Sequence, residues 1–281
     1  VDPPDTVVLR VWPQRHGQAR QHAWAAEGLA LSLIAHVFEL VPVDPDRVFL
    51  RGDTSVAALA WYIALNNPDR FAGVFTSRGH WADGVRSAPN ARGFAAFVLR
   101  EPGRRPITPF LGELTRVGAE HVVFDRPLTT KSKEDMRSRV QAWMRNVKRA
   151  PRAQAITLVG ARPTKVRSRW LRMSPRLRSE RESSVARRWA YRALSRPGVI
   201  TATIHKGNLV DVKTDRVTSF EVFVDPVHFD LKKPLRIRVN GRVPESHLIH
   251  LEAAHILEDY RRRRDPGLLY GFKVAVSVRD R

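Results

Sequence analysis

The sequence predicts an α/β protein: a mostly parallel sheet with helices on both faces, followed by a smaller β-rich domain. Three observations predict this class. Strand and helix patterns alternate over residues 1–150, basic residues crowd residues 151–198, and short strand patterns dominate residues 199–281. Repeated strand–helix units favour parallel strands, because each helix returns the chain to the edge from which the next strand starts.

The elements of the first 150 residues follow from their hydrophobic patterns. Short apolar runs predict strands, and apolar residues that recur every three or four positions predict helices. The predicted strands are 7–12, 48–50, 73–76, 94–99 and 121–124, and the predicted helices are 22–40, 56–66, 110–117 and 133–149. Pro68 ends the second helix, since the residue before a proline disfavours the helical conformation.

The character of the sequence changes after Pro151. Between Arg145 and Arg196 there are 16 basic residues and two acidic ones. This excess predicts a basic connector over residues 151–198, and its middle, "MSPRLRSERESSVARR" at 173–188, has the polarity of a surface loop or a poorly ordered insertion. Beyond it, a helix over 251–264 accompanies several short strands, and the pair Asn240-Gly241 predicts a hairpin turn.

Composition limits the function classes. The chain has 49 Lys and Arg against 28 Asp and Glu, so its net charge is +21. Such a charge attracts nucleic acid, anionic polysaccharide or a membrane surface. The absence of cysteine excludes disulfides and cysteine nucleophiles, and no apolar run is long enough to span a bilayer. Neither glycine-rich phosphate-binding motif occurs, so no cofactor is predicted.

Residues 43–75 contain a strand, a glycine turn and an alanine-rich helix, a layout that usually presents a nucleophilic serine. The flanks "VDPDRVFLRG" and "AWYIALNNPDRFAGVF" resemble the esterase and peptidase branch of the α/β-hydrolase superfamily, which includes esterase-D-like and polyhydroxyalkanoate-depolymerase-like proteins. The resemblance implies a partial α/β-hydrolase fold and a secreted or periplasmic location. The later segments "VDPVHFDLKKPLRIRVNGR" and "LLYGFKVAVSV" resemble the β-rich extension of planctomycete-type hydrolases.

The resemblance also implies positions for the catalytic residues. Such proteins carry G-x-S-x-G-G at the turn, and registering on Gly52 and Trp61 places Thr54 at the nucleophile position, with Ser55 next to it. Val56 and Ala57 then stand in place of the two glycines. A β-branched threonine followed by valine crowds a turn that depends on small residues, so the motif is predicted to be degenerate.

The catalytic partners fit the pattern poorly. The acid is expected after strand 94–99, where Glu101 lies among arginines. The histidine is expected after strand 121–124, but the segment "DRPLTTKSKED" has none, and His121 begins that strand instead of following it. His80, which follows strand 73–76, is a candidate binding residue. The segment "HLIHLEAAH" lacks the His-Glu-x-x-His order, so no metal site is predicted.

Three functional hypotheses follow. The first is a degenerate hydrolase that acts as a binding or scaffold protein. The second is an active carboxylesterase or peptidase that uses Ser55 or Thr54. The third is a basic protein that binds an anionic polymer through the Arg-rich connector, where Trp170, Trp189 and Tyr191 would stack on bases. Only five strands precede the connector, so the amino-terminal strands of a complete hydrolase sheet would be missing, and a partner chain or a helix would cover the open sheet edge.

Overall fold

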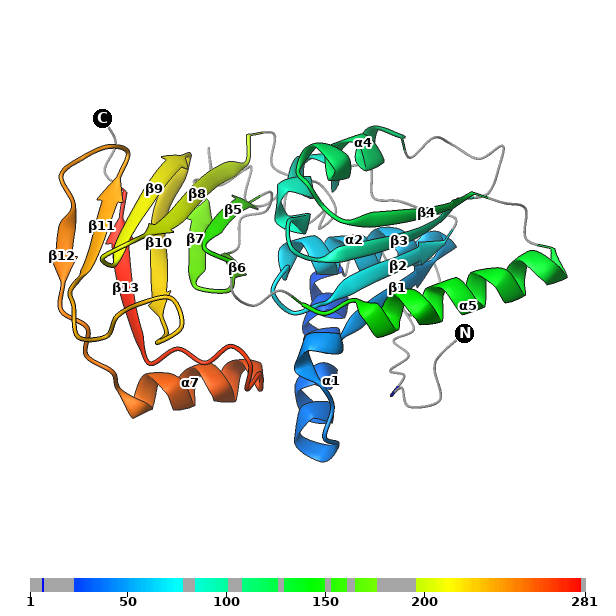
Figure 1. Ribbon diagram of the computed structural model, residues 1–281, viewed down its shortest axis with the longest axis horizontal. Coiled ribbons are helices and arrows are strands. Elements are labelled where there is room, and N and C mark those ends of the chain that lie inside the picture. Colours follow the sequence, from blue (N-terminus) through cyan, green and yellow to red (C-terminus); the bar gives the residue numbers. More distant parts are fainter. Residues whose placement is uncertain are drawn as a thin grey trace.

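The computed structural model describes residues 7, 23–77, 84–100, 108–125, 129–149, 153–160, 165–175 and 196–278. Figure 1 shows a parallel sheet with its helices at one end of the molecule and a β-rich half at the other. The fold class is therefore a mixture of helices and sheets, as the sequence predicts. The predicted strand at 7–12 lies outside the described residues apart from Val7, which has no regular secondary structure.

The first sheet consists of four parallel strands in the order in which they occur along the chain. They are β1 (Phe49–Asp53), β2 (Gly73–Ser77), β3 (Ala95–Arg100) and β4 (His121–Asp125). In the register of the sheet, Asp53 lies opposite Ser77, and Ser77 opposite Leu99. The carboxyl ends of all four strands therefore meet along one edge, where sheets of this type usually bind ligands.

Helices cover both faces of the parallel sheet (Figure 1). On one face α1 (Ala23–Leu40), α2 (Ala57–Asn66) and α4 (Thr108–Arg116) share an apolar cluster with Val74 and Ala96. On the other face α5 (Thr130–Asn146) packs against Phe75 and Phe97. The two faces receive alternate residues of β2 and β3, as expected for strands buried on both sides. No helix within the described ranges is both long and apolar enough to cross a membrane.

The β-rich half contains two further sheets. One is antiparallel with the order β13-β10-β7-β6, and the other has the order β12-β11-β9-β8-β5, in which only β11 and β9 are parallel. The strands and the helix of this half are β5 (Ala155–Gly160), β6 (Val166–Ser168), β7 (Leu171–Pro175), β8 (Gly198–His205), β9 (Leu209–Asp215), β10 (Val217–Val224), β11 (Leu235–Val239), β12 (Glu245–His247), α7 (Ala253–Arg263) and β13 (Phe272–Ser277).

The described part of the predicted basic connector is built into these sheets. Strand β5 pairs with β8 and strand β7 pairs with β10, so residues 155–160 and 171–175 are strands, and the first three residues of the predicted loop, 173–175, belong to β7. The physical reason is that Leu158, Leu171 and Met173 are fully buried in the apolar cluster of the β-rich half. Residues 176–195 lie outside the described part of the chain, and the division into domains at 150 and 198 stays a prediction.

The predicted turn at Asn240-Gly241 is confirmed. Both residues have positive φ angles, 51° and 76°, and the backbone N–H of Arg242 donates to the carbonyl oxygen of Val239 at 3.0 Å. Asparagine and glycine tolerate this left-handed backbone better than other residues do. The turn returns the chain from β11 to its antiparallel neighbour β12.

Candidate functional site

The predicted bend lies between β1 and α2, at the carboxyl edge of the parallel sheet. Thr54 is the first residue after β1 and opens a short 3-10 turn, Thr54–Val56, that leads directly into α2. Its φ angle is 49°, in the left-handed region. That conformation is unusual for a β-branched residue and costs on the order of 1–2 kcal/mol. Strained backbone at the end of a strand is typical of residues held in place for a function.

Gly52 permits the close approach of α2 to the end of β1. A Cβ atom added at this position would lie 2.8 Å from the Cα of Ala57 and 2.8 Å from the carbonyl oxygen of Val56. Both contacts involve backbone that a side chain cannot displace cheaply. The bend therefore needs glycine at this position.

Replacing Thr54 by glycine is expected to raise the free energy of unfolding by about 0.5–1 kcal/mol, because relief of the left-handed strain exceeds the added chain entropy of glycine. Urea unfolding of the two proteins measures the change. Thr54→Ala keeps a Cβ atom but removes the branch, so it should raise the free energy of unfolding by less than Thr54→Gly does. A loss of stability in Thr54→Gly would show that the bend is not strained.

Two polar pairs link neighbouring strand ends at this edge. Ser77 Oγ donates a hydrogen bond to Asp53 Oδ1, joining β2 to β1, and the Arg100 guanidinium bonds Asp125, joining β3 to β4. The hydrogen bond from Arg100 lowers the pKa of Asp125 below its ordinary value. The sequence reasoning missed these four residues. Each lies at the end of its strand, so the parallel register would have placed them together.

Of the other predicted site residues, Ser55 and His121 lie within the described part of the chain. Glu101 and His80 follow β3 and β2 in sequence, but both lie outside the described residues. Ser55 belongs to the turn through its backbone. His121 begins β4 opposite Ala96, at the amino end of the sheet, as predicted. Its Nδ1 lies 3.1 Å from the carbonyl oxygen of Ala119, so its contact is local.

Other described histidines also have local partners. His36 lies 3.6 Å from Glu39, and His255 lies 3.7 Å from Glu252. His228 Nδ1 bonds both carboxylate oxygens of Asp225 at 2.9 Å. Burial alone would raise the pKa of Asp225, but hydrogen bonds from His228 hold that pKa below its ordinary value. No group of three His, Asp or Glu side chains within the described ranges could hold a metal ion.

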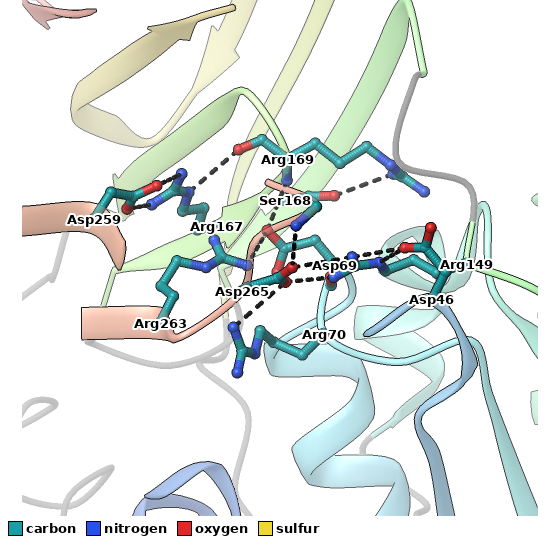
Figure 2. Close-up of polar contacts among 11 residues, drawn as sticks. Asp46, Asp69, Arg70, Arg149, Arg167, Ser168, Arg169, Asp259, Arg263 and Asp265 are labelled. Carbon is teal, nitrogen blue, oxygen red and sulfur yellow. Dashed lines mark hydrogen bonds and ion pairs between the residues drawn. The ribbon is translucent and has the colours of Figure 1, made fainter. Parts of the chain in front are cut away.

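A second cluster of charged residues lies where the β-rich half meets the parallel sheet (Figure 2). Arg149 donates to both carboxylate oxygens of Asp265 and, through Nε, to Asp46 at 2.9 Å. Arg149 reaches this position because α5 ends at Asn146, three residues earlier than predicted. The side chains of Arg149 and Asp265 are each only 1% exposed, so this ion pair is shielded from solvent.

Asp69 holds the other half of the cluster. It accepts hydrogen bonds from Arg263 Nη2 at 2.8 Å and from the backbone N–H of Arg169 at 2.9 Å. Arg167 forms a bidentate pair with Asp259, with distances of 2.6 and 3.0 Å. Loop, hairpin and helix residues far apart in sequence thus meet in one buried polar network.

This network changes the interpretation of the Arg-rich segment. Arg149, Arg169 and Arg172 are buried, and Arg167 is 10% exposed, so these four side chains do not form a surface for an anionic polymer. Trp170 is fully buried, and its Nε1 donates to the carbonyl oxygen of Ala153 at 2.7 Å. It therefore cannot stack on a nucleic-acid base. Trp189 and Tyr191 lie outside the described residues.

We compared the chain with known proteins at three levels. It matches no protein-family model, no curated protein and no solved structure. The likeness to esterases and peptidases consequently depends on the residues at 43–75 and on the segments 224–242 and 268–278, and it remains a prediction.

Proposed function

We propose that this chain is a catalytically degenerate protein of the α/β-hydrolase fold, from the esterase and peptidase branch, that acts by binding and not by hydrolysis. One observation carries the proposal. A strand of a parallel sheet ends in a bend whose first residue, Thr54, has a φ angle of 49°, and the bend runs directly into α2. A strained strand-to-helix turn of this kind is the feature that presents the nucleophile in α/β hydrolases.

The residues around the bend argue against hydrolysis. A hydroxyl becomes a nucleophile when a base, usually histidine, accepts its proton. The resemblance implies that this histidine follows β4, where the sequence is Asp-Arg-Pro-Leu-Thr, residues 125–129. The threonine methyl group and the side chain of Val56 further narrow the turn, where the hydrolase motif has serine and glycine.

An active esterase or peptidase is the second candidate. The left-handed backbone at Thr54 favours it, because a protein without use for the bend could relieve the strain with glycine. In that case Thr54 or Ser55 would be the nucleophile, and its base would have to come from a residue such as His80, which follows β2.

Hydrolysis of p-nitrophenyl acetate distinguishes the two candidates. We expect the protein to hydrolyse the ester no faster than a heat-unfolded sample, and Thr54→Ala and Ser55→Ala to leave this rate unchanged. Circular dichroism of each variant verifies that it is folded. Turnover above the unfolded control that disappears in either variant would establish the active enzyme and refute the degenerate one.

A further inference from the structure

A cavity of about 470 Å³ opens beside the buried charge network. Its walls come from α1, the loop that follows α2, the region of β6 and β7, and the end of α7. Eight basic side chains and two acidic ones line it, together with apolar side chains of α1 such as Leu31 and Ala35. The volume lies within the usual range of small-molecule sites.

The acidic side chains of this cavity already have basic partners. Asp69 accepts from Arg263, and Glu39 lies 2.9 Å from Arg264. The walls hold more positive charge than their own carboxylates neutralise, although Asp259 and Glu221 behind them also pair with Arg167 and Arg172. A cavity with one sign of charge and low-dielectric walls concentrates the electric field and attracts ligands of the opposite sign.

Arg70 places a buried positive charge in the wall of this cavity. It is 7% exposed, and its Nη1 has no hydrogen-bond acceptor among the described residues. The carboxylate of Asp265 lies 3.5 Å from Nη1, but Asp265 already accepts two hydrogen bonds from Arg149. Burial, and secondarily the charge of Arg263, lowers the pKa of Arg70 to about 10. An unsatisfied buried guanidinium N–H is costly, so it is normally bonded.

Arg263 offers a second donor in the same wall. It is 9% exposed, and although its Nη2 bonds Asp69, its Nε has no acceptor within the described residues. Arg70 and Arg263 thus both line one cavity, and each has a guanidinium N–H without an acceptor among the described residues. Guanidinium groups match the oxygens of phosphate and sulfate, which accept several hydrogen bonds at once.

We propose that this cavity is a binding site for a small organic anion bearing a phosphate or sulfate group. The guanidinium groups of Arg70 and Arg263 donate to the anionic group, and Leu31 and Ala35 contact the apolar part of the ligand. The site lies on residues other than the bend at Thr54, so it stands whether or not the bend hydrolyses esters.

Calorimetric titration with pyrophosphate and, separately, with sulfate tests the site at low ionic strength. We expect one pyrophosphate per chain and an affinity that falls steeply as salt is added. Sulfate binding tighter than pyrophosphate binding would identify a sulfated ligand, because pyrophosphate carries the larger charge. At pyrophosphate concentrations about one hundred times Kd, the midpoint of thermal unfolding should rise by roughly 5 °C.

Arg70→Met is the decisive variant. We expect it to bind pyrophosphate about tenfold more weakly or worse, because a charge-assisted hydrogen bond is lost. Without pyrophosphate its thermal midpoint should equal or exceed that of the parent, since a poorly neutralised buried charge is removed. Arg137 lies on the exposed surface of α5, outside the cavity. Arg137→Met removes the same charge there and should bind pyrophosphate as tightly as the parent does.

If Arg70→Met does not fold, Arg262→Met replaces it, because this exposed residue also lines the cavity. We expect it to weaken pyrophosphate binding several-fold. Failure of the parent protein to bind either anion would overturn the proposal. Binding that is weakened equally by Arg137→Met, or not at all by the cavity variants, would overturn it too, since such binding reflects net charge only.

Discussion

Replacing Asp69 by asparagine is expected to lower the free energy of unfolding by about 3–5 kcal/mol. Asparagine keeps the shape of the side chain but removes the charge that Arg263 and the backbone N–H of Arg169 face at 2.8 and 2.9 Å. The buried guanidinium groups would then lack a counter-ion, which costs more than the loss of one hydrogen bond. Urea unfolding followed by circular dichroism measures the change.

Asp135→Asn is the matched control. Asp135 pairs with Arg139 one turn along α5 at 2.9 Å, and the Arg139 side chain is 56% exposed. Removing an exposed pair of this kind changes stability by about 0–1 kcal/mol. A loss at Asp69 no larger than the loss at Asp135 would show that the buried network does not hold the two halves of the fold together.

The effect of Asp69→Asn should also depend on pH. Burial alone would raise the pKa of Asp69, but Arg263 and Arg167 hold it below its ordinary value of 3.8. A carboxylate with a lowered pKa contributes stability that is fully present above the unfolded value and is lost as the pH falls through the folded value. The difference between the parent and the variant should therefore narrow below about pH 4.

Trp170→Ala is expected to cost about 3–5 kcal/mol of unfolding free energy. The indole is fully buried among the apolar residues of the β-rich half, and its Nε1 bonds the carbonyl oxygen of Ala153. Alanine would leave a cavity and an unsatisfied carbonyl group. Thermal and urea unfolding both report the loss.

Val243→Ala controls for a simple reduction in apolar surface. Val243 is 88% exposed, so its truncation should change stability by no more than about 0.5 kcal/mol. If Trp170→Ala unfolds at the same urea concentration as Val243→Ala, Trp170 is not part of the core, and the earlier hypothesis of an exposed tryptophan that stacks on bases regains support.

Local sequence patterns were sufficient for much of the fold. The helices at α1 and α2 were predicted to within a residue or two, because their apolar periodicity and the Asn67-Pro68 stop are local signals. The bend was located for a similar reason, because Gly52 and Trp61, the residues that mark its position in the sequence, lie within a few residues of it. The pairs at the strand ends were accessible to the same reasoning once the strands were taken as parallel.

The buried charge network could not be predicted in this way. Arg149 bonds Asp46, 103 residues away, and Asp265, 116 residues away, so no local pattern links them. The density of arginine around β6 and β7 suggested solvent exposure, yet the side chains of Arg167 and Arg172 pair with Asp259 and Glu221 inside the fold. Charge density alone cannot distinguish a solvated segment from one whose charges are neutralised by distant residues.

We propose that the bend at Thr54 keeps a hydrolase-like backbone without an activated nucleophile. A fluorophosphonate reagent tests this directly, because it forms a covalent bond to an activated hydroxyl and releases fluoride. We expect intact-mass spectrometry of the folded, treated protein to show the unmodified mass. A stoichiometric adduct that peptide mapping assigns to Thr54 or Ser55 would contradict the claim.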